Sequence, residues 1–186
     1  MIGAAQKVFA MSGYHHASTD SIVKEAGISK GLLFHYFETK LGLYAFVYDY
    51  SVRFFQISCT TSISKQEKDF FLLAEQTERA WADAMRQFPY IRLFLSGAEM
   101  EDVPDAASAI LESRGKLEDI CREPEERASV DRFRPGADPQ RIRMMIRYTA
   151  EGIVRRQLYE GTFTPDTYRE EITGYIGMLR QMTYKD

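Results

Sequence analysis

The chain has 186 residues, of which 45% are hydrophobic and 27% are charged, and its net charge is −3. This is the balance of an ordinary soluble globular protein. No stretch approaches the ~20 apolar residues of a membrane-spanning helix, and the first residues do not resemble a secretory signal. Cys59 and Cys121 stand alone in the sequence, without a C-x-x-C pair. They are therefore expected to be reduced core thiols, and the protein is expected to be cytoplasmic.

Helical spacing of apolar residues recurs from the N-terminus, while the alternating pattern of strands is nearly absent. Gly13 is expected to end the first helix. Ser18 or Thr19 can cap the next helix, which Gly27 ends, and Ser29 can cap the helix after it. The helices predicted in this half are 2–12, 18–26, 29–37 and a longer one from 39 to a polar junction at 58–67.

The second half of the chain shows the same periodicity. Prolines mark several helix starts because their fixed φ suits the first helical turn. The helices predicted here are 66–88, 89–98, 104–121, 138–159 and one from 164. The polar stretch 122–138 is expected to be a loop or a frayed helix end. The chain is thus predicted to be all-α, with about nine helices and no sheet.

Two of the short helices, joined by a tight turn at Gly27, match the helix-turn-helix plan, in which the second helix enters the major groove of DNA. Hydroxyls and free N–H groups at a helix start suit phosphate oxygens, and Gly31 would let the backbone approach DNA closely. Residues 1–50 carry four Lys and four acidic residues, so this segment is neutral and permits DNA contact without requiring it. The residues predicted to contact DNA are Ser18, Thr19, Ser29, Lys30, Gly31, Leu32, His35, Tyr36 and Lys40.

The segment STDSIVKEAGISKGLLFHYF, with Lys40 after it, resembles the signature of the TetR family of transcriptional regulators. The resemblance rests on Ser18-Thr19, Ile22-Val23, the run 26–31, the run 34–37 and Lys40. It implies a helix-turn-helix domain at 1–45, with its motif at 18–37, and a ligand-binding and dimerisation domain at 46–186. It also implies an Ω-shaped homodimer that represses transcription and leaves its DNA operator when a small apolar or amphipathic effector binds, through a shift of the fourth helix. No cofactor is implied.

Two departures from the family pattern stand out. The family commonly has Glu after the conserved Lys, whereas Leu41 and Gly42 follow here, and Gly inside a helix costs about 1 kcal/mol relative to Ala. Most members also carry a basic arm before the first helix, while this chain starts at Met1 almost inside it. Either the given start is internal, or the protein is expected to bind DNA weakly.

The second half is rich in aromatic residues and methionines that could line an apolar pocket or simply form the core. Pocket residues are predicted at Phe70, Trp81, Met85, Phe94, Met144 and Tyr148. The last two helices also present apolar faces that could form a four-helix dimer seam or pack within their own subunit. Dimer contacts are predicted at Ile142, Met145, Ile146, Thr149, Ile153, Ile172, Tyr175, Ile176 and Leu179.

The sequence offers two alternatives to a DNA-binding regulator. Glu99, Glu101 and Asp102 form a small acidic cluster, but the sequence has no metal spacing, phosphate loop or nucleophile elbow, so it predicts no enzyme. Adjacent His15 and His16 would diverge on a turn, and no metal site is predicted. A ligand-binding dimer that has lost DNA binding is the alternative that the missing arm leaves open.

Overall fold

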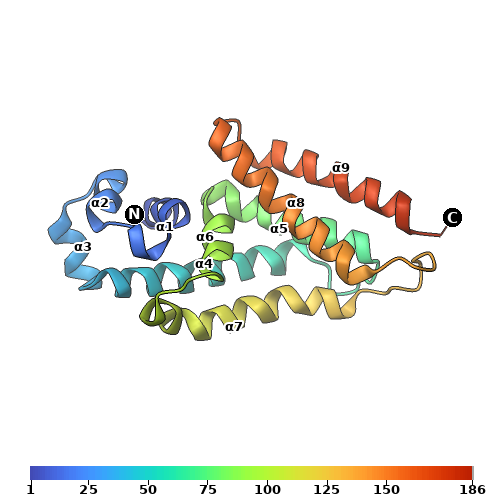
Figure 1. The fold of residues 1–186 in the computed structure, drawn as a ribbon, viewed down its shortest axis with the longest axis horizontal. Helices are drawn as coiled ribbons and strands as arrows, with labels where there is room; N and C mark the ends of the chain where they lie inside the picture. The colour runs from blue at the N-terminus through green and yellow to red at the C-terminus, as the bar shows by residue number, and fades with distance from the viewer. Residues whose placement is uncertain (186) are drawn as a thin grey trace. The chain divides into compact units, whose positions relative to one another are not determined.

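A computed structural model describes residues 1–185, and Figure 1 shows the order of its helices along the chain. Within these residues there are nine helices and no strand, which confirms the predicted all-α fold. The helices are α1 (Ile2–His16), α2 (Thr19–Ala26), α3 (Lys30–Phe37), α4 (Lys40–Ser62), α5 (Phe70–Gln87), α6 (Ile91–Ala98), α7 (Pro104–Arg127), α8 (Pro139–Glu160) and α9 (Pro165–Thr183).

The chain divides into two compact units, which are described separately. Unit 1 contains Met1–Gln56 and Gln87–Asp119, and unit 2 contains Ile57–Arg86 and the chain from Ile120 onward. Two of the crossings between the units fall inside α4 and α7. The predicted boundary at residue 45 remains a prediction.

The core of unit 1 forms where α1 packs against α6 and α2, and α2 packs against α3. The rings of Phe9, Tyr44 and Phe94 pack together, with centroids 5.0 Å apart for Phe9 and Tyr44 and 5.8 Å for Tyr44 and Phe94. A buried hydrogen bond from Gln6 Nε2 to Ser51 Oγ, 2.9 Å long, also joins α1 to α4. Aromatic packing and one buried polar link therefore hold α1 on α4.

The turn between α3 and α4 has unusual backbone geometry. Glu38 has φ 56° and ψ −45°, and the N–H of Thr39 donates to the carbonyl of Phe37, which closes a γ-turn of the rare, strained kind. A Cβ at Gly42 would lie 2.7 Å from that same carbonyl oxygen. Gly42, a departure from the family pattern, is thus the residue that lets the first turn of α4 approach the end of α3.

Unit 2 contains a cluster of four aromatic rings near the C-terminal end of α9. Tyr184 packs against Phe71 and Phe133 with centroids 4.8 and 5.1 Å apart, and Phe133 packs against Phe70 at 5.0 Å. The backbone joins in through an isolated antiparallel bridge between Phe133 and Tyr184. The cluster anchors the irregular segment 128–138, which the sequence predicted as a loop.

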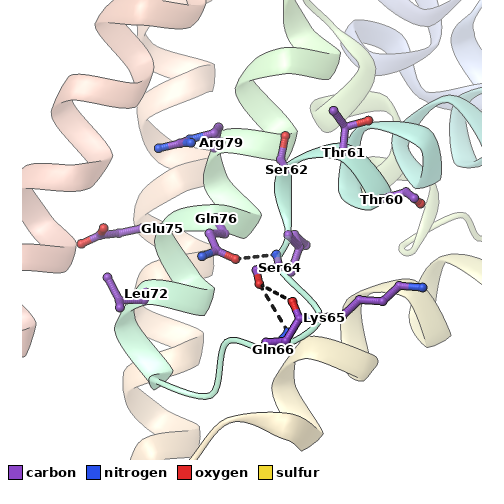
Figure 2. Close-up of a pocket in the computed structure, with 11 residues that line it drawn as sticks. Thr60, Thr61, Ser62, Ser64, Lys65, Gln66, Leu72, Glu75, Gln76 and Arg79 are labelled. Carbon is purple, nitrogen blue, oxygen red and sulfur yellow. Dashed lines mark hydrogen bonds between the residues drawn. The ribbon is translucent and has the colours of Figure 1, made fainter.

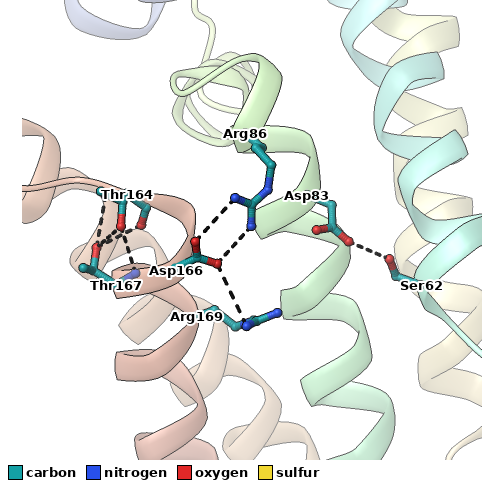
Figure 3. Close-up of polar contacts among 7 residues, drawn as sticks. All are labelled: Ser62, Asp83, Arg86, Thr164, Asp166, Thr167 and Arg169. Carbon is teal, nitrogen blue, oxygen red and sulfur yellow. Dashed lines mark hydrogen bonds and ion pairs between the residues drawn. The ribbon is translucent and has the colours of Figure 1, made fainter.

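Polar contacts hold α5 against α9 in the same unit (Figure 3). Arg86 donates to both oxygens of Asp166, and the shorter contact is 2.9 Å. Thr164 and Thr167 form a capping box that begins α9. The hydroxyl of Tyr168 donates to the buried carboxylate of Glu78. Both partners of this last contact are buried, so the hydrogen bond is made away from solvent.

Several helix boundaries differ from the prediction. α5 begins at Phe70 rather than residue 66, because Asp69 Oδ1 accepts the N–H groups of Phe71 and Leu72 at 3.1 Å each and caps the helix there. α7 runs six residues past the predicted end at Cys121, although Pro124 lies inside it. Arg127 stabilises the extension by donating to the carbonyls of Glu67 (3.1 Å) and Ser64 (3.0 Å), a contact between distant segments.

The close approach at Gly42 makes a prediction about stability. Gly42→Ala should lower the free energy of unfolding by about 1–3 kcal/mol in urea denaturation, because a backbone carbonyl cannot move aside for the new methyl. The matched control is Gly115→Ala in α7, where a Cβ would meet nothing within 4 Å. The control should raise stability by up to about 1 kcal/mol through helix propensity. Equal effects of the two substitutions would contradict the assignment.

Candidate nucleic-acid interface

Residues 18–37 form two short helices whose ends are capped as the sequence predicted. Ser18 Oγ accepts the N–H of Ser21 at 3.0 Å at the start of α2, and Ser29 Oγ accepts the N–H of Leu32 at 3.2 Å at the start of α3. Gly27 ends α2 with φ 66°, a conformation that favours glycine. Of the two candidate caps of α2, Ser18 and Thr19, the structure has Ser18, and the predicted N-cap at Ser29 and stop at Gly27 are confirmed.

The rotation of α3 about its axis is fixed by one side chain. Leu33 is fully buried, as is Ile22 on α2, so these two residues join the helices from the inside. Residues two positions before and after Leu33 lie about 160° away around the helix. Gly31 and His35 therefore face solvent, and both are exposed. Tyr36 is 68% exposed and Leu32 is 45% exposed on the flanks of this outer face.

Charged residues on this surface are paired with one another. Lys30 Nζ lies 2.8 Å from Asp20 Oδ1, and both side chains are more than half exposed. On the other side of α2, Lys7 Nζ lies 2.7 Å from Glu25 Oε1, and this hydrogen bond raises the pKa of Lys7. Exposed pairs of this kind contribute little to stability, so the ammonium of Lys30 can exchange Asp20 for another anion with little loss.

The side chain of Lys40, another predicted DNA contact, is bound to backbone carbonyls. Its ammonium, at the start of α4, donates to the carbonyl oxygens of Tyr14 (2.8 Å), Ala17 (3.2 Å) and His15 (3.4 Å). It also lies 4.3 Å from the centroid of the Tyr14 ring. A cation is favoured where a helix leaves its last carbonyls unpaired. Lys40 therefore binds the end of α1 to α4.

The same end of α1 is held from a second direction. Glu101, in the loop between α6 and α7, accepts the N–H of Tyr14 at 3.3 Å and the N–H of Val103 at 3.1 Å. Burial, followed by the carboxylates of Asp105 and Glu101, raises the pKa of Tyr14. The helix is able to turn at this point because Gly13 has φ 66°. Neither the Glu101 contact nor the Asp20 partner of Lys30 was predicted, since no sequence spacing signals them.

Residues 1–46 match the sequence profile described as "Bacterial regulatory proteins, tetR family". This match covers the capped helix pair and the residues on both sides of it. Over these residues the chain is similar to the tetR family of bacterial regulatory proteins. The resemblance inferred from residues 18–40 is thereby confirmed, and the description of regulatory proteins agrees with the expectation that the chain is not an enzyme.

The TetR fold extends over the whole chain. A TetR-family transcriptional regulator from Chloroflexus aurantiacus is 16% identical, with a TM-score of 0.70 over 100% of this chain and 92% of the other. FadR from Bacillus subtilis, solved in complex with stearoyl-CoA, is 16% identical with a TM-score of 0.58 over 94% and 95%. PfmR from Thermus thermophilus is 15% identical with a TM-score of 0.57 over 95% and 94%. No curated protein sequence matches the chain.

The residues predicted to line a pocket fall into two groups. Phe70, Trp81 and Met85 are buried in unit 2, and Phe94 is buried in the aromatic core of unit 1. Met144 and Tyr148 are instead 44% and 61% exposed on α8. The pocket assignment remains a prediction, and the last two residues lie on a surface rather than in a core.

The residues predicted to form the dimer seam also divide by burial. Three reach or approach the surface: Met145 (52% exposed), Tyr175 (43% exposed) and the half-buried Thr149. The remaining six are buried within the subunit: Ile142, Ile146, Ile153, Ile172, Ile176 and Leu179. The seam itself remains a prediction, and these six are already covered by their own subunit.

The described part of the chain has two open cavities, and neither is lined by the predicted pocket residues. One, of about 550 Å³, lies between the end of α4 and α5 (Figure 2). Its polar groups bind each other: Gln76 Oε1 accepts the N–H of Ser64 at 2.8 Å, and Ser64 Oγ contacts Gln66 Oε1 at 3.2 Å. The second, of about 520 Å³, lies beside the kinked end of α1 and is lined by residues 12–16, 97 and 100–104.

Within residues 1–185, no helix is long and apolar enough to cross a membrane. In the same part of the chain, no group of three or more His, Cys, Asp or Glu residues could hold a metal ion. His15 and His16 are exposed neighbours whose rings lie edge to face, with centroids 4.7 Å apart.

The position of the Lys40 ammonium makes a prediction that separates it from an ordinary surface lysine. Lys40→Met should lower the free energy of unfolding by about 1.5–3 kcal/mol, because carbonyls of α1 lose a charged donor. Lys24→Met on the exposed surface of α2 is the control and should change stability by less than about 0.5 kcal/mol. Urea denaturation of the two variants measures the difference, and no loss for Lys40→Met would refute the capping role.

Proposed function

We propose that the chain is a dimeric, ligand-responsive transcriptional repressor that reads its operator through α3. The single observation that carries this proposal is the exposed outer face of α3, opposite the buried Leu33. A helix used only for packing would not leave Lys30, Gly31, His35 and Tyr36 in solvent. Such a helix, capped at its N-terminus and preceded by a second capped helix, has the form that enters a major groove.

The predicted DNA contacts have different roles in this proposal. Ser18 and Ser29 use their hydroxyls for capping, so their contribution to phosphate binding would come from free N–H groups of the first helical turns, where Thr19 also lies. Lys30, His35 and Tyr36 present donors on the outer face of α3. We assign Lys40 to holding the helix-turn-helix rather than to a phosphate, because its ammonium already binds three carbonyls.

We further propose that a small apolar or amphipathic molecule controls DNA binding. FadR of Bacillus subtilis, which has the same fold, was solved with stearoyl-CoA. Phe70, Trp81 and Met85 of α5 supply buried aromatic and sulfur surface in unit 2 that suits an apolar effector. Such a regulator would act in the cytoplasm. Mass spectrometry of compounds that co-purify with the full chain would identify the effector class.

A second copy of the chain is the proposed partner on α8 and α9. Large apolar side chains are exposed along both helices: Met144, Met145, Tyr148, Tyr175, Met178 and Met182. Several large apolar side chains exposed on two helices suit an association site, and a two-fold dimer would bring two helices from each subunit together. Dimerisation would also place two recognition helices on one operator, with half-site centres about 34–36 Å apart or a multiple of that distance.

Binding of the full chain to the DNA upstream of its own coding sequence tests the proposed function. The chain should prefer a site in this DNA over random duplex by roughly 10³-fold or more, as measured by fluorescence anisotropy at fixed salt. Equal affinity for the two duplexes would reject the proposal and favour the ligand-binding dimer without DNA recognition.

Gly31→Ala locates the interface without disturbing the fold. A Cβ at Gly31 meets nothing within 4 Å in the free protein, and alanine favours the helix by about 1 kcal/mol. We therefore expect a variant that is at least as stable as the original but binds its operator roughly tenfold or more weakly, since the methyl would meet DNA. Gly115→Ala is the matched control and should keep full affinity. An unchanged affinity for Gly31→Ala would remove this residue from the interface.

Charge at the proposed dimer surface tests the partner. Met145→Glu should weaken self-association roughly 100-fold or more, because a dimer would bury an unpaired carboxylate twice. Leu111→Glu, at a 60% exposed leucine of α7, is the control and should leave association unchanged. Sedimentation velocity over a range of concentrations measures both. A dimer unaffected by Met145→Glu would place the interface elsewhere.

A further inference from the structure

The exposed face of α3 is poor in groups that can read bases by hydrogen bonding. Only Lys30, His35 and Tyr36 on this face carry side-chain donors, and Lys30 is paired with Asp20. Gly31 carries no side chain at all. The remaining exposed residue of the first turn is Leu32, which has no polar atom in its side chain. A recognition helix of this composition must take part of its sequence information from apolar contact.

Leu32 occupies the position where such a contact is made. It lies in the first turn of α3, and side chains of a helix tilt towards its N-terminus, which is the end that meets base edges. Its neighbour Leu33 is fully buried and fixes the rotation that leaves Leu32 45% exposed. A single exposed leucine is common on protein surfaces. What distinguishes Leu32 is its place in the first turn of α3 next to Gly31, which carries no side chain of its own.

The backbone N–H of Leu32 already has a hydrogen-bond partner. Its N–H donates to Ser29 Oγ at 3.2 Å, so this residue has no free donor on either its side chain or its amide. Among the base edges in the major groove, the one feature that an aliphatic side chain recognises is the 5-methyl group of a pyrimidine. Thymine carries this methyl in ordinary DNA, and 5-methylcytosine carries it after methylation.

We propose that Leu32 is a specificity-determining residue that selects one thymine in each operator half-site by packing against its 5-methyl group. This rests on the proposed function, since it assigns a base to one residue of that interface. Burial of one methyl group corresponds to about a fourfold change in affinity. With two half-sites in the operator, the change becomes roughly 16-fold.

The test removes the methyl group alone. An operator is first selected from a random duplex library with the full chain. Each thymine is then replaced singly by deoxyuridine, symmetrically in both half-sites, which keeps base pairing unchanged. At one position the original chain should lose about 16-fold in affinity. Leu32→Ala should bind the thymine and deoxyuridine duplexes equally at that position, and Leu111→Ala, at an exposed leucine of α7, should behave like the original chain.

A second variant provides an independent readout. Leu32→Gln replaces the aliphatic group by one that pairs with adenine, so repeated selection should change the preferred base at that same position and at no other. Cytosine there should bind weakly to the original chain, and 5-methylcytosine should recover part of the affinity. Recovery shows that the methyl group itself is recognised, whereas equal binding of cytosine and 5-methylcytosine argues against the contact.

The outcomes separate this inference from the proposed function. If selection yields a preferred operator but Leu32→Ala retains the same thymine-to-deoxyuridine ratio at every position, the Leu32 assignment is wrong and the DNA-binding function stands. If selection yields no preferred sequence, both are rejected. Leu32→Ala removes only an exposed side chain, so circular dichroism should show the original helicity and melting temperature.

Discussion

The burial of Leu33 on α3 is the constraint on which the proposed interface depends. A helix repeats about every 3.6 residues, so fixing one side chain inside fixes the direction of all the others. With Leu33 inside, Gly31 and His35 point outward, and Leu32 and Tyr36 flank them. A rotation of α3 by one residue would bury Leu32 and expose Leu33. The identity of the outward residues therefore follows from the burial of Leu33 on the opposite face of the helix.

A second constraint comes from the end of α1. Its last carbonyls are bound by the Lys40 ammonium from α4, and the N–H of Tyr14 is bound by Glu101 from the loop after α6. Charged groups from two different parts of unit 1 thus meet on one short segment of backbone. The break at Gly13 gives this segment its own direction. These contacts hold the end of α1, from which the chain continues into α2.

Features with local causes could be predicted from the sequence. The N-caps at Ser18 and Ser29 and the stop at Gly27 follow from interactions within four residues, and the structure has all three. Features with distant causes could not. The extension of α7 depends on Arg127 reaching residues about sixty positions earlier. The exposure of Met144 on α8 depends on which helix face packs inward, and periodicity alone does not distinguish a surface stripe from a core one.

The tight link after α3 has a consequence for engineering. The strained backbone of Glu38 and the close approach of Gly42 to the Phe37 carbonyl leave no room for a larger residue or a longer turn between α3 and α4. If α3 were replaced by a helix from another protein together with that protein's turn, the new turn would not fit the start of α4. A chimera built on this scaffold should keep residues 37–42 together and vary only positions 30–36.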